Sequence, residues 1–310
     1  MKAVLINNYG PPEVLTLAEI EKPKPKEDQI LVKVHAATVC LGDTRLRSSN
    51  FPTFFWIPAR LMLGIFRPKK KILGHEFAGI VEETGENVTR FKVGDEVFGT
   101  TSMLNTGSYA EYICLPEQWN NGVVDLKPVN SSFSEAAALP IGGMTALYLL
   151  EKANLKRGQK ILVYGASGSV GSYAVQIAKL KGAEVTAVCS ASNFDMMRSL
   201  GIEKLIDYRT KNYWELEDKY DIIFDAVGKT SRSKAKKVLS PAGKYVTIMM
   251  FTKEKTEHLK QLKQWVEDGK LKSFIDKRYT LDKIVKAHSY VDQGHKRGNV
   301  VIDIVKDEPD

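Results

Sequence analysis

The pattern of apolar and polar positions divides the chain into two kinds of sequence. Up to about residue 125 the apolar residues come in short runs, and residues 31–36 alternate as a half-buried strand does. Glycines with an Asn or Asp one or two residues later separate these runs, as at 85–87 and 93–95, and supply the chemistry of tight turns. This part of the chain therefore predicts a β-rich domain.

From about residue 126 the period changes. We expect Ser134 and Glu135 to open a helix, and residues 161–164 to form a buried strand. Helical and strand patterns then alternate to about residue 272, which is typical of a parallel sheet covered by helices. Strand character returns at 299–304.

The expected fold class is therefore α/β, with two domains. Residues 126–272 are expected to form a parallel-sheet domain inserted into a β-rich domain, which consists of residues 1–125 and is completed by 273–310. A length of 310 residues is enough for two separate cores. The cleft between two such domains is the natural place for a ligand.

One segment, residues 51–66, fits neither pattern. Its apolar residues follow no clean helical or strand period, and Pro52 and Pro58 are expected to break it. We interpret it as a lid or wall over an apolar substrate pocket, with a dimer contact or packing on the β-rich domain as alternatives. Attachment to a membrane surface is a weaker alternative, because the basic residues follow the segment instead of lining one face of it.

The composition argues against several classes of protein. The apolar and charged fractions, 43% and 26%, are those of an ordinary soluble globular protein, and no apolar run is long enough to span a bilayer. No apolar signal region follows the first residues, so we expect a cytoplasmic protein without stable membrane insertion. Cys40, Cys114 and Cys189 form no Cys-x-x-Cys pair, which argues against a disulfide scaffold and against a thiolate-only zinc site.

The formal net charge of +8 admits nucleic acid, an acidic membrane face or a phosphorylated ligand as a partner. The basic residues are spread along the chain, and no nucleic-acid recognition motif accompanies them. We therefore expect no nucleic-acid partner and attribute the positive charge to a phosphate-bearing cofactor.

The strongest local signal is the sequence KILVYGASGSVG at 160–171, which an amphipathic helical pattern follows. It has the form A-x-G-x-x-G, with Ala166 where the usual fingerprint has its first glycine. Gly168 is expected to let the backbone approach a pyrophosphate, with any positive φ that the turn requires, and Gly171 to let the helix lie close to the strand. The N-terminus of the helix attracts anions. Because no Lys-Ser/Thr follows the glycines, the motif predicts a dinucleotide site and not a P-loop.

The end of the second strand of this unit selects the cofactor. An NAD enzyme usually carries an acidic residue there, whereas this chain has Ser190. We interpret Ser192-x-x-Asp195 as a capping box that starts the next helix. With no carboxylate to repel a 2′-phosphate, NADPH is the expected cofactor. Ser190 is expected to donate a hydrogen bond to that phosphate, and Tyr208 to lie on the same rim, with simple packing as the alternative.

With these motifs in place, the chain resembles the medium-chain dehydrogenase/reductase superfamily, in its zinc-independent quinone oxidoreductase (zeta-crystallin-like) branch. The resemblance covers nearly the whole length, and it rests on MKAV at 1–4, LGHEFAG at 73–79, FKVGDEVFG at 91–99, GSYAEY at 107–112, AAALP at 136–140 with Thr145 and Ala146, the glycine turn at 165–171, DAVG at 225–228 and GNVV at 298–301. It implies a GroES-like β-rich catalytic domain around a Rossmann domain, NADPH in the interdomain cleft, and a homodimer.

The glycine motif and the family's positions beside the nicotinamide together define the expected cofactor site. The expected cofactor-binding residues are Thr145, Ser167, Gly168, Ser169, Val170, Gly171, Ser190, Tyr208, Val227 and Met249.

The resemblance also bears on a metal. Zinc-dependent members of the family hold the ion with a Cys, the His of Gly-His-Glu and a later Cys. Cys40 and His75 are retained here, but Ile141 stands at the third position and offers no lone pair. Glu76 is an alternative third ligand. We expect no metal, with His75 a hydrogen-bonded residue beneath the cleft and Cys40 a small core residue.

Without a Lewis acid, alcohol oxidation is difficult, whereas reduction of a quinone or an α,β-unsaturated carbonyl asks mainly for a hydride donor and an oriented acceptor. We therefore expect an NADPH-dependent quinone or enone oxidoreductase. Asp43 matches the family's Asn-x-x-Asp position, with Cys40 in place of the Asn, and both are expected on the substrate side. Arg47 is the candidate partner of Asp43, and a purely structural salt bridge is the alternative. The sequence does not identify the proton donor, and bulk water could serve.

Three other functions stay open: a zinc-type alcohol dehydrogenase or aldehyde reductase, a non-catalytic NADPH-binding protein, and a nucleotide-fold methyltransferase. The last is disfavoured because the family motifs extend far outside residues 160–190. The physiological substrate depends on the shape of the pocket and not on the fold.

Overall fold

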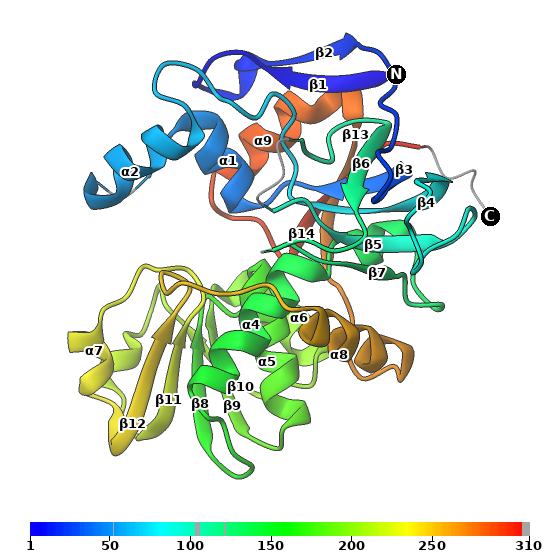
Figure 1. Ribbon diagram of the computed structural model, residues 1–310. Helices are drawn as coiled ribbons and strands as arrows, with labels where there is room; N and C mark the ends of the chain where they lie inside the picture. Colours follow the sequence, from blue (N-terminus) through cyan, green and yellow to red (C-terminus); the bar gives the residue numbers. More distant parts are fainter. Residues whose placement is uncertain (52, 103–105, 121, 306–310) are drawn as a thin grey trace. The chain divides into compact units, whose positions relative to one another are not determined.

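The computed structural model describes residues 1–51, 53–102, 106–120 and 122–305. The chain forms two compact units, one made of Met1–Pro140 with Ile275–Asp310 and the other of Ile141–Phe274. Figure 1 shows a β-rich unit and a unit in which helices flank a sheet. The second unit is inserted into the sequence of the first. This arrangement confirms the fold class expected from the sequence.

The first unit is built on a seven-stranded sheet of order β13-β14-β3-β4-β5-β7, in which β6 also pairs with β3, and a separate sheet pairs β1 with β2. The pairs are antiparallel except for β13 with β14, which run parallel. The strands are β1 (Lys2–Ile6), β2 (Leu15–Glu19), β3 (Gln29–Thr38), β4 (Glu76–Thr84), β5 (Glu96–Thr100), β6 (Tyr112–Pro116), β7 (Val124–Leu126), β13 (Ile275–Thr280) and β14 (Asn299–Asp303).

Strand β3 contains the strand expected at 31–36 and holds the centre of this sheet. Its half-buried His35 stacks on Phe133 of α3 (Phe133–Ala137), with ring centroids 4.2 Å apart. Helix α3 also packs on β4 and β5. The first compact unit therefore continues past residue 125 to Pro140, whereas the sequence placed 126–140 in the α/β domain. The assignment of a catalytic role to residues 1–125 and 273–310, and of cofactor binding to residues 126–272, stays a prediction.

The first unit also contains α1 (Leu41–Ser48) and α9 (Ile284–Asp292). Along α9, Ile284, Ala287 and Val291 are buried at helical spacing and join a core with Val300 and Ile302 of β14. The C-terminal part of the chain therefore supplies both a helix and a central strand to this unit.

The segment at 51–66 forms a helix, α2 (Thr53–Leu63), so the expectation that prolines break it is wrong for Pro58. Pro58 lies in the second turn, where its missing N–H removes only one early hydrogen bond. Pro52 lies outside the described residues. Ile57, Leu61 and Phe66 are more than half exposed, at 65%, 60% and 88%. The role of this segment stays a prediction. No described helix has the length and apolar character needed to cross a bilayer.

The second unit is a five-stranded parallel sheet of order β10-β9-β8-β11-β12, with β9 and β10 on one side of β8 and β11 and β12 on the other. This is the strand arrangement of a Rossmann sheet. Its strands are β8 (Lys160–Tyr164), β9 (Glu184–Cys189), β10 (Lys204–Asp207), β11 (Tyr220–Asp225) and β12 (Leu239–Thr247). Its helices are α4 (Pro140–Lys152), α5 (Ser169–Leu180), α6 (Phe194–Ser199), α7 (Arg232–Lys236) and α8 (Thr256–Glu267).

The helix expected to open at Ser134 begins one residue earlier. Ser132 is the N-cap of α3: its hydroxyl accepts from the Glu135 N–H, and the Glu135 carboxylate accepts from the Ser132 N–H. Ser134 instead donates to Asp303, at 2.8 Å. The capping box therefore uses Ser132, three residues before the glutamate.

Candidate active site

The glycine turn connects β8 to α5 as the sequence predicts. Gly165 has φ +80°, and a Cβ there would lie 2.5 Å from a methyl of Val227. A Cβ on Gly171 would lie 2.2 Å from the Gly165 carbonyl oxygen and 2.8 Å from the Ala166 Cα. A larger residue at Gly165 would be strained by the positive φ and would displace the Val227 side chain, whereas at Gly171 it would require a shift of the backbone. Gly171 thus gives the close approach of helix to strand that the sequence predicts for it.

Gly168 differs from the expectation in one respect. It is the N-cap of α5 with φ −78° and ψ 176°, an extended conformation that any residue can adopt, so no positive φ is required there. A Cβ on Gly168 would touch only the Gly165 carbonyl oxygen, at 3.5 Å. The space in front of the helix N-terminus is therefore open on this side, where free N–H groups and a partial positive charge favour an anion.

The ends of β9 and β10 form one rim of the site. Cys189 pairs with Asp207 in the parallel register, so Ser190 and Tyr208 follow neighbouring strand ends. Asn193 was not predicted from the sequence, yet its side-chain amide donates to Ser190 Oγ at 3.1 Å and to Ser167 Oγ at 2.9 Å. It therefore joins the rim to the glycine turn.

The proposed capping box at Ser192 is wrong. A short 3-10 helix, Ala191–Asn193, follows β9, and α6 begins at Phe194 with Asn193 as its N-cap. Ser192 Oγ lies 3.0 Å from Ser190 Oγ, and Asp195 pairs with Arg198 at 3.0 Å. Both residues of the expected box are thus used by other partners.

The loop after β11 holds the opposite rim. Asp225 is fully buried, and its carboxylate accepts from the N–H of Val227 at 3.1 Å and of Gly228 at 2.9 Å, and from the Tyr245 hydroxyl at 3.0 Å. Gly228 has φ +70°, and a Cβ there would lie 3.1 Å from Met249 Cγ. The buried Asp225 carboxylate therefore holds the backbone of Val227 and Gly228, and Met249 lies next to Gly228. The sequence analysis did not identify this role of Asp225.

Thr145 lies near the start of α4, which is in contact with the start of α5. A Cβ on Gly142 would lie 2.4 Å from Ser169 Oγ and 2.9 Å from the Tyr173 ring, so the first turns of α4 and α5 are in contact. Thr145 is three residues further along α4 and shares that face. All ten expected cofactor residues thus lie past the carboxyl ends of the parallel strands or in the first turns of α4 and α5, the edge at which such sheets bind ligands. Their contacts with the cofactor stay a prediction.

In the first unit, Asp43 organises the predicted substrate side. Its carboxylate is fully buried and accepts from the Cys40 N–H at 2.9 Å, the Gly74 N–H at 3.1 Å and His75 Nδ1 at 2.7 Å. Burial alone would raise the pKa of Asp43, but the charge and hydrogen bond of His75, with the contacts of Cys40, hold that pKa well below its usual range. Asp43 is therefore an ionised carboxylate that fixes the His75 ring.

Arg47 is not the partner of Asp43, and this expectation is wrong. Arg47 is buried, and it donates to the carboxylate of Asp292 at 2.7 Å and to the Gly10 carbonyl at 3.1 Å. Its third contact is His288 Nδ1, at 3.1 Å. Since α9 supplies both Asp292 and His288, the guanidinium ties α1 to α9.

The described residues contain one group that could hold a metal ion, Cys40, Asp43 and His75, whose donor atoms lie within 4.8 Å of one another. Glu76 is not in it, and its carboxylate accepts from the Thr38 hydroxyl. The group is already joined internally, since Asp43 is bonded to His75. Burial, followed by the charges of Asp43 and Glu76, raises the pKa of the Cys40 thiol well above its usual value. Ile141, at the family's third ligand position, offers no lone pair, and the absence of metal stays a prediction.

Lys296 is a further residue that the sequence analysis missed. It precedes β14, its ammonium donates to the Gly298 carbonyl at 2.6 Å, and it is partly buried. Burial lowers its pKa, and Cys40 and Glu76 act in the opposite direction. Lys296 therefore comes near Cys40 and Glu76, although no local pattern in the sequence connects them.

Comparisons with known proteins match both units of the chain. Two family models match the chain, the alcohol dehydrogenase GroES-like domain at residues 26–127 and the zinc-binding dehydrogenase at residues 169–280. The chain is 35% identical to the 2-methylene-furan-3-one reductase of Solanum lycopersicum over 97% of its own length and 79% of the relative. It is 34% identical to the chloroplastic NADPH-dependent alkenal/one oxidoreductase of Arabidopsis thaliana, with the same coverage.

Among solved structures, the quinone oxidoreductase from Coxiella burnetii superposes with a TM-score of 0.83 at 28% identity, over 98% of this chain and 99% of that one. The sequence similarity and the shared fold both extend over almost the entire chain, across the β-rich unit and the inserted parallel sheet. The chain therefore belongs to the medium-chain dehydrogenase/reductase superfamily, in its quinone oxidoreductase branch.

Proposed function

We propose that this protein is an NADPH-dependent oxidoreductase that reduces a quinone or an α,β-unsaturated carbonyl by hydride transfer. The observation that carries the proposal is the end of β9, where a Rossmann sheet presents the Ser190 hydroxyl in place of the carboxylate that NAD enzymes use. The names of the relatives, a 2-methylene-furan-3-one reductase and an NADPH-dependent alkenal/one oxidoreductase, support the substrate class.

The residues of the second unit fit NADPH. Gly168 and the N-terminus of α5 would hold the pyrophosphate, and Ser190 would donate to the 2′-phosphate. The guanidinium carbon of Arg209 lies 5.9 Å from the centre of the Tyr208 ring, and it adds positive charge at this rim. Thr145, Val227 and Met249 would line the nicotinamide. When bound, NADPH supplies the hydride, and the protein contributes orientation and polar groups.

On the substrate side, Asp43 acts on the substrate through other residues. It is fully buried and its oxygens are occupied, so it positions the His75 ring and the start of α1. The Asp43 contact places the proton of a neutral ring on Nδ1 and leaves Nε2 as an acceptor. The Cys40 thiol stays protonated at neutral pH and is therefore not a nucleophile.

The proposal includes a homodimer in the cytoplasm that has no nucleic-acid partner. Light scattering during size-exclusion chromatography tests the dimer, and a change of elution with an oligonucleotide tests the absence of nucleic-acid binding. A monomer at all concentrations would remove the dimer from the proposal and leave the chemistry untouched.

The experiment that tests the function follows NADPH consumption by absorbance with a panel of quinones, enones, aldehydes and ketones. We expect turnover of quinones or enones, and faster turnover with NADPH than with NADH. The Ser190→Asp variant should lose the preference for NADPH while keeping its fold. A protein that binds NADPH but reduces no member of the panel would support the non-catalytic alternative instead.

The zinc-type alcohol dehydrogenase is the second candidate, because Cys40, Asp43 and His75 bring three donor atoms together. Elemental analysis of the purified protein and assays with a strong chelator separate the two candidates. Stoichiometric zinc, together with loss of alcohol or aldehyde turnover on chelation, would establish the second candidate and overturn the first.

A further inference from the structure

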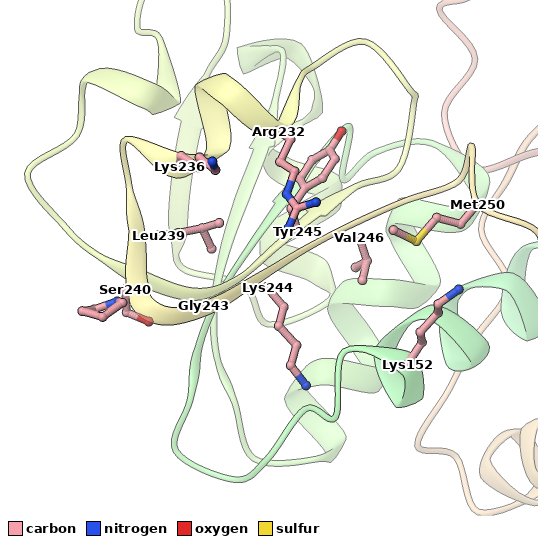
Figure 2. A pocket seen from close by; sticks show the side chains of 11 residues that line it. Lys152, Arg232, Lys236, Leu239, Ser240, Gly243, Lys244, Tyr245, Val246 and Met250 are labelled. Atoms are coloured by element: carbon pink, nitrogen blue, oxygen red, sulfur yellow. The ribbon is translucent and has the colours of Figure 1, made fainter.

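The second unit contains a pocket of about 590 Å³ along its edge strand β12, shown in Figure 2. A volume of this size lies in the usual range for small-molecule sites. The pocket is lined in part by apolar and aromatic side chains, and in part by cations from three elements. No residue of the glycine turn at 165–171 lines it, so it is separate from the proposed pyrophosphate position. The six lining side chains that matter here are Lys152, Arg232, Lys236, Lys244, Tyr245 and Met250.

The four cations come from separate places in the fold. Lys152 ends α4, Arg232 and Lys236 lie at the two ends of α7, and Lys244 lies on β12. No Asp or Glu lines the pocket, and none of the four cations has an ion pair within the part of the chain that the structure describes. Their charges therefore add, and a concave surface of one sign concentrates counter-ions.

The surrounding sequence strengthens this charge. Between Asp225 and Glu254 the chain has seven lysines and arginines and no acidic residue. Asp225 itself is buried, and its oxygens accept from backbone N–H groups and from the Tyr245 hydroxyl. One carboxylate beneath the strand does not balance four cations around the pocket.

We propose that this pocket binds the di- or polyphosphate group of a small molecule, at a site distinct from the dinucleotide site. Two or more phosphates match four cations in charge, and the Arg232 guanidinium can contact a phosphate through two parallel hydrogen bonds. Tyr245 and Met250 supply an apolar wall for the rest of the ligand. A pocket of this volume suits a compact molecule better than the extended backbone of a nucleic acid. The proposal does not depend on the proposed reductase activity.

The test is a calorimetric titration of inorganic pyrophosphate into the full-length protein, first alone and then saturated with NADPH. NADPH occupies the proposed dinucleotide site, so the second titration reports on other sites. We expect pyrophosphate to bind in both titrations, and the affinity to fall as salt is raised. A parallel titration with ATP and with inorganic phosphate distinguishes a nucleotide from a simple phosphate source, and we expect ATP to bind at least as tightly as pyrophosphate.

A lysine outside the pocket provides a matched control. Lys236→Gln and Lys244→Gln each remove one charge from exposed positions, and each should weaken pyrophosphate binding about tenfold. Lys234→Gln removes the same charge from the same helix as Lys236, but Lys234 lies over the Trp214 ring at 3.9 Å and does not line the pocket. Its affinity for pyrophosphate should stay within about twofold of the wild type. Circular dichroism and thermal melting verify that all three variants are folded.

Several results would overturn the proposal. One is that pyrophosphate does not bind at millimolar concentration. Another is that Lys234→Gln weakens pyrophosphate binding as much as Lys236→Gln and Lys244→Gln do. Displacement of NADPH by pyrophosphate would mean that the anion binds only at the glycine turn. An oligonucleotide that binds through Lys236 and Lys244 while pyrophosphate and ATP do not would point to nucleic acid.

Discussion

Lowering the pH should destabilise this protein through one buried histidine. His288 is fully buried, and burial, the largest influence, lowers its pKa from the ordinary 6.5 to about 4, while the Asp43 carboxylate acts in the opposite direction and Arg47 adds to the lowering. Arginine can only donate, so the 3.1 Å contact between Arg47 Nη1 and His288 Nδ1 requires an unprotonated Nδ1. Protonation of the ring would therefore break this contact and place two cations together.

The magnitude follows from the two pKa values. Because the folded pKa lies below the unfolded one, the unfolded chain takes up the proton first, so stability is full above about pH 6.5 and is lost as the pH falls toward about 4. The complete loss from this group is about 3 kcal/mol, and about 2 kcal/mol of it appears between about pH 7.5 and about pH 5. That is a substantial fraction of the stability of an ordinary domain.

The assay is urea unfolding at these two pH values. His288→Asn keeps an acceptor for Arg47, since the amide oxygen takes the place of Nδ1, and removes the titration. His295→Asn, at an exposed position, is the matched control. We expect the wild type and the control to lose about 2 kcal/mol more than His288→Asn on acidification. If all three proteins lose the same amount, the assignment of this pH dependence to His288 is refuted.

Three further predictions concern the proposed active site. NADPH should bind more tightly than NADH by about 1–3 kcal/mol through contacts with the 2′-phosphate; calorimetry that gives equal affinities would contradict the role of Ser190. Activity should survive a strong chelator, because Ile141 stands at the family's third ligand position and has no lone pair to offer a metal; loss of turnover that zinc restores would show the opposite. Gly168→Val should abolish NADPH binding, measured by fluorescence titration, at a cost of about 1 kcal/mol or less in stability, because its Cβ meets only one atom, at 3.5 Å. Gly171→Val is the contrasting variant and should disrupt the fold, since its Cβ would lie 2.2 Å from a carbonyl oxygen; a Gly168→Val protein that still binds NADPH would place the cofactor elsewhere.

Features encoded over a few neighbouring residues could be predicted from the sequence. The glycine turn and its flanking strand and helix were predicted because periodicity and glycine spacing are local signals. The absence of a carboxylate at position 190, on which the preference for NADPH rests, is likewise visible in the sequence itself. Local rules failed where several residues offered the same chemistry, as with Ser132 and Ser134, only one of which caps α3.

Features that depend on distant partners could not be predicted. Arg47 was expected beside Asp43, which is four residues away on the same helix, but it pairs with Asp292 from the other end of the chain. Nothing in the sequence around Arg47 distinguishes these two carboxylates. Lys296 comes near Cys40 and Glu76 for the same reason, because tertiary packing brings together residues that are far apart in the sequence.

The position of β14 has a consequence for synthesis on the ribosome. This strand lies between β13 and β3 in the sheet, yet it is made after the whole inserted unit. Until residues 299–303 emerge, the backbone of β3 lacks its partner along 36–38, and the N-terminal strands carry an open sheet edge of the kind that pairs with other chains. The inserted unit has no such dependence, because all five strands of its sheet are contiguous in sequence. Nascent chains stalled before β14 should therefore contain a folded inserted unit and an incomplete β-rich unit. The open sheet edge of the β-rich unit makes these chains prone to aggregation and dependent on a chaperone.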